Sequence, residues 1–452
     1  MAHTIAAIAT GRSVSAIGIL RLSGEDAIGT AARVFTADNG QSLTEAPDRK
    51  LILGVLRDRQ GRVLDQVQAV VSRAPRSYTG EDTVELQCHG SPAALTAGLD
   101  ALFAAGARQA GPGEFTKRAF LNGRMDLIQA EAVIDLIEAE TAEAAANAAG
   151  QLAGAVSRRL GPVYQELAGV CAHFHAVLDY PDEDIQPFQL TSYRNVLERA
   201  LDTLARLRRS YDRGRVLKEG LKTAILGKPN VGKSSLLNAL AGYERVIVSE
   251  QAGTTRDAVT ESIRLGGMVL RVTDTAGLRE TGDGIEARGV ELARRAAGEA
   301  DLLFCVFDGS RPLDAEDERV IDEGLDAGNA IAILNKNDLP SVLLPSDLPF
   351  EYVVPLSAKT GNGLELLEQA VSVMFPDELP CDGELLTNPR QAAALDRAGM
   401  ALSRALDAVG VVTPDAALVD VEEGLEALGE LTGKVMRQEI TEQIFSRFCV
   451  GK

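Results

Sequence analysis

The residues most clearly able to do chemistry form one stretch, Gly227-Lys228-Pro229-Asn230-Val231-Gly232-Lys233-Ser234. It matches the pattern G-x-x-x-x-G-K-[ST], in which glycines allow successive backbone N–H groups to face phosphate oxygens. Lys233 adds a positive charge for the β- and γ-phosphates, and Ser234 adds a hydroxyl for Mg²⁺. A short apolar run precedes the stretch, and a helix-forming run starts at Ser235. The sequence therefore predicts a phosphate-binding loop between a strand and a helix.

Two later motifs supply further ligands for the phosphates and the metal. Gly253-Thr254-Thr255-Arg256-Asp257 contains a threonine that can complete the Mg²⁺ shell. Asp274-Thr275-Ala276-Gly277 follows the apolar run 269–272, which reads as a strand. Asp274 can organise the metal from there, and the N–H of Gly277 can bind the γ-phosphate. The spacing predicts a nucleoside triphosphate as the substrate.

Two more motifs identify the base. Asn335-Lys336-Asn337-Asp338 ends the apolar run 330–334. Asp338 can accept hydrogen bonds from N1–H and the N2 amine of guanine, and adenine offers neither donor. Ser357-Ala358-Lys359 follows another short strand and can present its backbone to the guanine O6. The predicted nucleotide is therefore GTP.

The group that activates water is less clear from the residues alone. Leu278 stands where Ras-type GTPases carry a glutamine that orients the attacking water, and leucine cannot do so. Glu286 is the candidate replacement, Glu280 and Glu291 compete with it, and a solvated carboxylate at a helix start is the alternative reading. Asn230 could bind a monovalent cation beside the phosphates or make a local turn hydrogen bond.

The surrounding sequence predicts a multidomain protein of mixed α/β and α class. Its length of 452 residues favours roughly two to four domains. Residues 1–120 alternate short strands with turns and predict an α+β domain. Residues 121–215 and 379–452 have helical periodicity, and we expect them to form one all-α domain that carries an inserted Ras-like P-loop G domain over 216–378. Gly161-Pro162 and Tyr180-Pro181 are predicted to break the first helical part into separate helices.

Composition narrows the function classes. We find no apolar run of about 18 residues and no signal peptide, so no membrane association is predicted. Five scattered cysteines suit a reducing cytoplasm and argue against a disulfide framework or zinc site. His173 and His175 are expected on different faces of a helix, which disfavours a shared metal. The net charge of −19 counts against broad contact with a nucleic-acid backbone, so a local patch or a basic partner would have to hold any such substrate.

Several further motifs carry a family resemblance over the whole chain. They are Ser77-Tyr78-Thr79-Gly80-Glu81-Asp82, Pro112-Gly113-Glu114-Phe115, Arg118-Ala119-Phe120-Leu121-Asn122 and the terminal Cys449-Val450-Gly451-Lys452. Together with the GTPase motifs, in this order, they resemble the MnmE (TrmE) tRNA-modification GTPases.

The resemblance implies an activity and its partners. Members of this family dimerise through an N-terminal folate-binding domain, and K⁺ promotes dimerisation of their G domains and stimulates hydrolysis. They assemble with a flavoprotein, MnmG (GidA), as a heterotetramer. The complex adds an aminomethyl or carboxymethylaminomethyl-type group to C5 of the wobble uridine (U34) of certain tRNAs. The one-carbon unit comes from 5-formyl- or 5,10-methylene-tetrahydrofolate.

The resemblance also assigns roles to residues at matching positions. It implies catalytic roles for Glu286 and Cys449. It implies Mg²⁺ ligation by Ser234 and Thr255, K⁺ ligation by Asn230, Ser249, Gln251 and Thr254, and folate contacts from Arg21, Glu85, Arg124 and Lys452. The implied GTP-binding set is Asn230, Val231, Gly232, Lys233, Ser234, Ser235, Ser249, Glu250, Gln251, Ala252, Gly253, Thr254, Thr255, Asp274, Thr275, Ala276, Gly277, Asn335, Lys336, Asp338, Ser357, Ala358 and Lys359. Arg124 replaces the lysine of some members, and Gln251 replaces an expected aliphatic residue, although a backbone carbonyl would serve there.

Two other classes of function remain open at this point. A ribosome-assembly GTPase of the Era or Der kind would carry a KH module or a second G domain, and neither is evident in the sequence. A folate-dependent enzyme in which GTP is only regulatory would still modify tRNA when hydrolysis is disabled.

Overall fold

The computed structural model describes residues 3–11, 13–179, 190–243, 260–273, 297–375, 383–411, 414–435, 438–446 and 448–451. The chain divides into two compact units. The first contains residues 1–134, 149–206 and 390–452, and the second contains residues 135–148 and 207–389. Both units are therefore assembled from segments far apart in the sequence.

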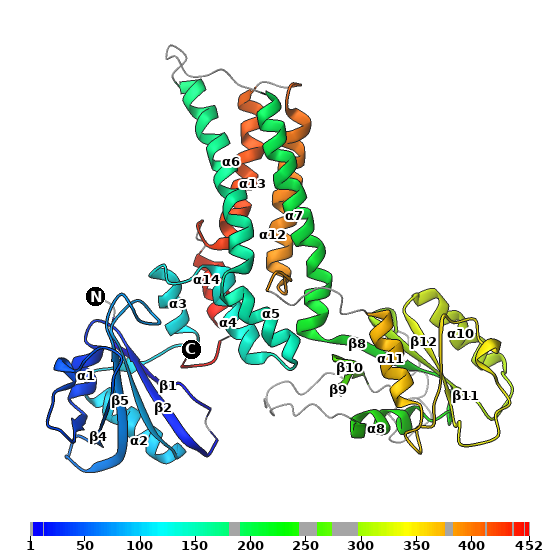
Figure 1. Cartoon of the computed structure of the whole chain (residues 1–452), viewed down its shortest axis with the longest axis horizontal. Coiled ribbons are helices and arrows are strands. Elements are labelled where there is room, and N and C mark those ends of the chain that lie inside the picture. Colours follow the sequence, from blue (N-terminus) through cyan, green and yellow to red (C-terminus); the bar gives the residue numbers. More distant parts are fainter. Residues whose placement is uncertain are drawn as a thin grey trace, which may run out of the picture. The chain divides into compact units, whose positions relative to one another are not determined.

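The first unit begins with a seven-stranded sheet in the order β3-β4-β5-β6-β2-β1-β7, drawn in blue in Figure 1. Its strands are β1 (Ile5–Ile8), β2 (Ser15–Ser23), β3 (Phe35–Ala37), β4 (Leu51–Arg57), β5 (Val63–Ser72), β6 (Thr83–Gly90) and β7 (Arg108–Gln109), with α1 (Ala27–Ala32), the short helix Leu43–Glu45 and α2 (Pro92–Ala104) between them. Alternate residues of the strands form a core with α2, as Leu20, Leu86 and Leu102 are fully buried. The strands predicted at 17–22, 51–55, 67–71 and 84–88 are confirmed.

The remainder of the first unit is helical. Some of its helices continue into the second unit. The helices in this part of the chain are α3 (Glu114–Leu121), α4 (Leu127–Glu138), α5 (Ala142–Leu152), α6 (Ala155–Asp179), α7 (Leu190–Glu219), α12 (Pro389–Ala408), α13 (Pro414–Thr432) and α14 (Gln438–Ser446). Figure 1 shows α6, α7, α12 and α13 running side by side. His175 of α6 lies 2.8 Å from Glu422 of α13, and Arg194 of α7 donates to the Val409 carbonyl, just after α12, at 3.4 Å. The prediction that residues 389–452 return onto the earlier helices is confirmed.

A buried ion pair also joins the two halves of this bundle. Arg390 donates from Nε and Nη2 to the Glu131 carboxylate at 2.8 and 2.9 Å, and Gln391 donates to the same carboxylate at 2.8 Å. Glu131 is only 3% exposed, so these donors replace the water that its charge would otherwise need.

One predicted helix break is wrong. Pro162 lies inside α6, which continues from Ala155 to Asp179. Proline cannot donate a hydrogen bond to the carbonyl four residues earlier, so it normally destabilises a helix interior. Buried Leu160, Val163 and Leu167 fix this helix in the bundle, and tertiary packing therefore outweighs the local preference. Tyr180-Pro181 lies outside the described residues.

The two histidines of this bundle have separate partners. His173 Nδ1 is 2.8 Å from the Tyr193 hydroxyl, and His175 Nε2 is 2.8 Å from Glu422. These partners lie on different helices, α7 and α13, which agrees with the prediction that the two histidines occupy different faces. Among the described helices, none is long and apolar enough to cross a membrane.

The second unit contains a six-stranded sheet in the order β13-β12-β11-β8-β10-β9. Its elements are β8 (Leu221–Leu226), α8 (Lys233–Tyr243), β9 (Thr260–Leu265), β10 (Met268–Thr273), β11 (Leu302–Asp308), α10 (Ala315–Ala327), β12 (Ala330–Asn335), the short helix Pro345–Asp347, β13 (Tyr352–Pro355) and α11 (Leu364–Met374). Neighbouring strands are parallel except β9 against β10, and every residue of β11 and β12 is buried. The carboxyl ends of the parallel strands consequently meet at one edge, where ligands of such sheets bind.

Candidate functional site

The predicted phosphate loop leaves the carboxyl end of β8 and enters α8. Gly227 and Gly232 have φ angles of 149° and 102°. A Cβ on Gly227 would lie 2.5 Å from the Val306 carbonyl oxygen, and one on Gly232 would lie 2.2 Å from Asn335 Nδ2. Both positions therefore need glycine for space as well as for conformation.

Lys233, the first residue of α8, turns back over its own loop. Its ammonium donates to the carbonyl of Gly227 at 2.5 Å and to that of Lys228 at 3.0 Å. Phosphate oxygens can replace these carbonyls as acceptors while the backbone N–H groups at the start of α8 face the same anion. Ser234 and Ser235 follow on the first turn and are exposed.

Asn335 connects the phosphate loop with the two base-recognition loops. Its Nδ2 donates to the Val231 carbonyl at 2.7 Å, and its Oδ1 accepts from the Ala358 N–H at 2.9 Å. The side chain is on the last residue of β12, and Asn335 is 2% exposed. One buried amide thus fixes the loops after β8, β12 and β13 relative to one another.

Asp338 is held as an acceptor for the base. The Ser357 hydroxyl donates to its Oδ1 at 2.7 Å, and this hydrogen bond lowers the pKa of the Asp338 carboxyl. Its neighbour Lys336 adopts a φ of 64° and donates to Asp308 at 2.7 Å. The carboxylate of Asp338 is therefore ionised at neutral pH, as recognition of the guanine N1–H and N2 amine requires.

Part of the predicted nucleotide and metal site falls outside the described residues. These positions are Ser249, Glu250, Gln251, Ala252, Gly253, Thr254, Thr255, Asp274, Thr275, Ala276, Gly277 and Glu286. Of the predicted metal ligands, the structure describes Asn230 and Ser234, which are exposed on the loop and on the first turn of α8. An amide oxygen and a hydroxyl are ligands that K⁺ and Mg²⁺ accept, so the residues present fit these ions.

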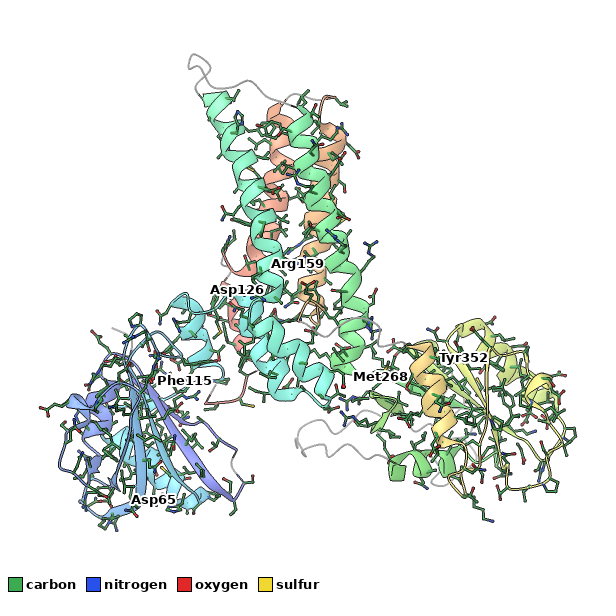
Figure 2. The ribbon with its side chains drawn as sticks, viewed as in Figure 1. Asp65, Phe115, Asp126, Arg159, Met268 and Tyr352 are labelled. Carbon is green, nitrogen blue, oxygen red and sulfur yellow. The ribbon has the colours of Figure 1, made fainter. Side chains whose placement is uncertain are left out.

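A second group of predicted residues comes together in the first unit. Arg21 of β2 lies directly opposite Glu85 of β6, and their side chains form an ion pair at 2.8 Å. The Arg21 guanidinium lies over the rings of Tyr78 and Phe115, 5.6 and 5.8 Å from their centroids. Phe115, labelled in Figure 2, is on the first turn of α3. Arginine, carboxylate and two aromatic rings form a site suited to a planar, charged molecule.

Sequence reasoning did not assign Tyr78 and Phe115 to this site, although both stand inside motifs that it singled out. The Tyr78 hydroxyl is 2.9 Å from the Thr116 hydroxyl, and burial raises its pKa. Phe115 is fully buried, which makes one wall of the site rigid. Arg124 is exposed, with its stem beside Gly80.

The described end of the chain also reaches this group. Val450 forms a bridge with Pro112, and the Gly113 N–H donates to the Cys449 carbonyl at 3.4 Å. Arg21 Nη1 donates to the Gly451 carbonyl at 3.5 Å. Cys449 is exposed, whereas the other described cysteines are buried. Lys452 lies outside the described residues.

The parallel sheet, the phosphate loop after β8 and the linked loops after β12 and β13 define a P-loop nucleotide-binding domain of the GTPase class. A family model described as the MnmE helical domain matches residues 127–449, and one described as the GTP-binding protein TrmE N-terminus matches residues 4–124.

Curated relatives match the chain over its length. The protein named tRNA modification GTPase MnmE is 39% identical in Carboxydothermus hydrogenoformans, covering 100% of both chains. The proteins of the same name in Geobacillus thermodenitrificans and Geobacter sulfurreducens are 40% and 41% identical, and each match covers 99% of both chains. The chain belongs to the MnmE family.

Asp338→Asn should change the preferred base from guanine to xanthine. An amide can donate to the 2-oxo group that replaces the amine, whereas losing the charged acceptor should weaken GTP binding by about 10- to 100-fold. Competition binding with GTP, XTP and ATP measures this exchange, and Asp326→Asn on the exposed face of α10 is the control. Unchanged preference for GTP in Asp338→Asn would contradict the assignment.

Proposed function

We propose that this protein is a GTP hydrolase that acts in tRNA modification. The observation that carries the proposal is the Asn335 hydrogen-bond network, which joins a phosphate loop to an ionised guanine acceptor in a chain that belongs to the MnmE family. The curated relatives are named for the same activity.

The described residues support a binding role for each part of the site. Lys233 is positioned to exchange the carbonyls of Gly227 and Lys228 for phosphate oxygens, and Asp338 selects the base. Ser234 and Thr255 would hold Mg²⁺, which when bound supplies charge neutralisation at the phosphates. The remaining GTP contacts proposed are those of the motifs around Gly253 and Asp274.

For hydrolysis, we assign the activation of water to Glu286. Leu278 has no group that can orient water, so hydrolysis needs another group, and the carboxylate of Glu286 is the one that the family resemblance favours. Asn230, Ser249, Gln251 and Thr254 would hold K⁺, which supplies a positive charge beside the phosphates. Stimulation by K⁺ and pairing of two G domains are parts of this proposal.

In the N-terminal domain, proposed to span residues 1–120 and to dimerise, we assign a folate site to Arg21, Glu85, Arg124 and Lys452. Two observations support it: Arg21 and Glu85 are paired across the strands, and the exposed Tyr78 offers an aromatic face for a pterin above the buried Phe115. A carboxylate can accept from a 2-aminopterin edge as Asp338 does from guanine, and an arginine can bind the glutamate tail. 5-Formyl- or 5,10-methylene-tetrahydrofolate would supply the one-carbon unit.

The proposed product is an aminomethyl or carboxymethylaminomethyl-type group on C5 of U34 in certain tRNAs, made with the flavoprotein MnmG in a heterotetramer. The net charge of −19 disfavours broad contact between this chain and the polyanionic tRNA, and a basic partner could hold the tRNA instead. A helical domain over 121–215 and 379–452 would carry the G domain over 216–378. Since tRNA is the substrate, the proposed location is the cytoplasm.

Glu286→Ala should lower GTP hydrolysis by about 100-fold, the scale of losing a general base, while nucleotide affinity is kept. Phosphate release in KCl and NaCl, with mant-GTP titration, measures both quantities, and K⁺ but not Na⁺ should stimulate the wild type. Glu280→Ala and Glu291→Ala are the matched controls. Equal wild-type rates in the two salts would refute the cation role, and a larger loss in either control would move the base to that residue.

Full-length protein should bind 5-formyltetrahydrofolate, and Arg21→Met should weaken binding by at least about tenfold because a charge-assisted contact is lost. Isothermal calorimetry measures this, with Arg62→Met on the exposed β4–β5 turn as the control. No heat of binding to the wild-type protein would count against the folate site.

Cys449→Ser should abolish tRNA modification and leave K⁺-stimulated GTPase activity within about twofold, because Cys449 is exposed two residues before Gly451, whose carbonyl binds Arg21, and the nucleotide site belongs to the other unit. Nucleoside analysis of tRNA from a complemented deletion strain gives the first result and phosphate release the second. Val450→Ala, which keeps the backbone bridge, is the control. Persistence of modified uridine would show that the thiol is dispensable, and loss of both activities would show that Cys449 acts through folding.

A further inference from the structure

The second residue of the phosphate loop, Lys228, is bound to a neighbouring helix. Its ammonium lies 2.6 Å from Asp314 Oδ2 and 2.6 Å from Asp317 Oδ2, at the start of α10. The side chain of Lys228 is 13% exposed and that of Asp317 is 4% exposed. The side chain of Asp314 is 56% exposed, so the pair with Asp317 is the desolvated one, and it is stronger than an exposed surface ion pair.

Both carboxylates are themselves fixed. Asp314 is the N-cap of α10 and accepts from the N–H groups of Glu316 and Asp317 at 3.0 and 3.2 Å. Asp317 Oδ2 accepts in return from the Asp314 N–H at 3.1 Å, which completes a capping box. The other oxygen, Asp317 Oδ1, is buried and has no hydrogen-bond partner among the described residues. Lys228 is therefore bound to a rigid helix end and compensates the charge of a nearly buried carboxylate.

The loop that Lys228 belongs to is conformationally strained. Asn230 has a φ of 64° between two glycines that also have positive φ. A non-glycine residue in this region is conformationally unfavourable and persists where its surroundings hold it. The Val231 carbonyl is held downstream by Asn335, and Lys228 is held upstream by α10. Asn230 lies between these two fixed points.

We propose that Lys228 is a positioning residue: by binding Asp314 and Asp317 it keeps the phosphate loop in its anion-binding conformation before the nucleotide arrives. The inference rests on the GTP-binding role proposed above. A preformed loop lowers the conformational cost of binding, since the ordering has already occurred during folding. The loop binds the substrate and the transition state equally. Loss of the Lys228 contacts should therefore raise KM and leave kcat unchanged.

If Lys228 instead acted directly on the nucleotide through its charge, substitution of its partner Asp317 would have the opposite effect on nucleotide binding. If the ammonium simply attracted phosphate, Asp317→Asn would free positive charge and tighten nucleotide binding. If Lys228 acts through the tether, both Lys228→Met and Asp317→Asn weaken binding, and the second change adds little once the first has been made.

The experiment uses the full-length chain with five variants: Lys228→Met, Lys228→Arg, Asp317→Asn, the double variant Lys228→Met with Asp317→Asn, and Glu318→Gln. The last removes a carboxylate from the same helical turn at a residue that does not bind Lys228. Mant-GDP and mant-GTP affinities, steady-state KM and kcat, and thermal unfolding are measured for each.

We expect Lys228→Met and Asp317→Asn each to weaken the binding of both nucleotides and to raise KM by about tenfold. The kcat of each variant should stay within about twofold of the wild-type value. The double variant should bind nucleotide with the same affinity as the weaker-binding single variant. Lys228→Arg should keep most of the wild-type affinity, and Glu318→Gln should bind as tightly as the wild type. Tighter binding in Asp317→Asn, additive losses, or a lowered Tm with unchanged affinity would each overturn the positioning role. Absence of nucleotide binding in the wild type would overturn the GTP site itself.

Discussion

The buried amide of Asn335 is the interaction on which the nucleotide site depends. An asparagine can donate and accept at once, and here it does so to Val231 and Ala358, which belong to loops after two different strands. Parallel strands bring their carboxyl ends to one edge, but that arrangement alone leaves the loops free to move relative to one another. The Asn335 amide fixes this spacing. Gly232 allows the close approach, because a Cβ at position 232 would lie 2.2 Å from Asn335 Nδ2.

The other proposed site depends on contacts between parts of the chain that are far apart. Arg21 and Glu85 are brought together by the β2–β6 register, and Gly451 reaches Arg21 from the far end of the chain. Residues 389–452 can approach the N-terminal sheet because α12 and α13 return along α6 and α7 (Figure 1). The buried Glu131–Arg390 pair fixes the beginning of that return. The bundle therefore positions a terminal segment, and the stability of the bundle decides whether that site is complete.

The nucleotide site and the Arg21 site lie in different units of the chain, and each has its own polar network. In the first unit, aromatic rings and one ion pair surround a single arginine. In the second, strained backbone is fixed by hydrogen bonds at Asn335 and by the ion pairs of Lys228. The helices α4, α5, α7 and α12 contribute residues to both units.

The sequence by itself determined the local chemistry. Glycine and lysine spacing predicted the phosphate loop between β8 and α8, and Asp338 predicted guanine, because those properties depend on neighbouring residues and on strand and helix periodicity. The predicted strands were confirmed for the same reason, whereas the helical return was inferred from two stretches of helical periodicity on either side of the G domain. Only the tertiary structure decided that Pro162 stays within α6, where packing outweighs a local preference. It also supplied Tyr78 and Phe115 around Arg21, and it paired Lys228 with Asp314 and Asp317, 86 and 89 residues away. Such pairings depend on which elements the fold brings together, and no spacing along the chain encodes them.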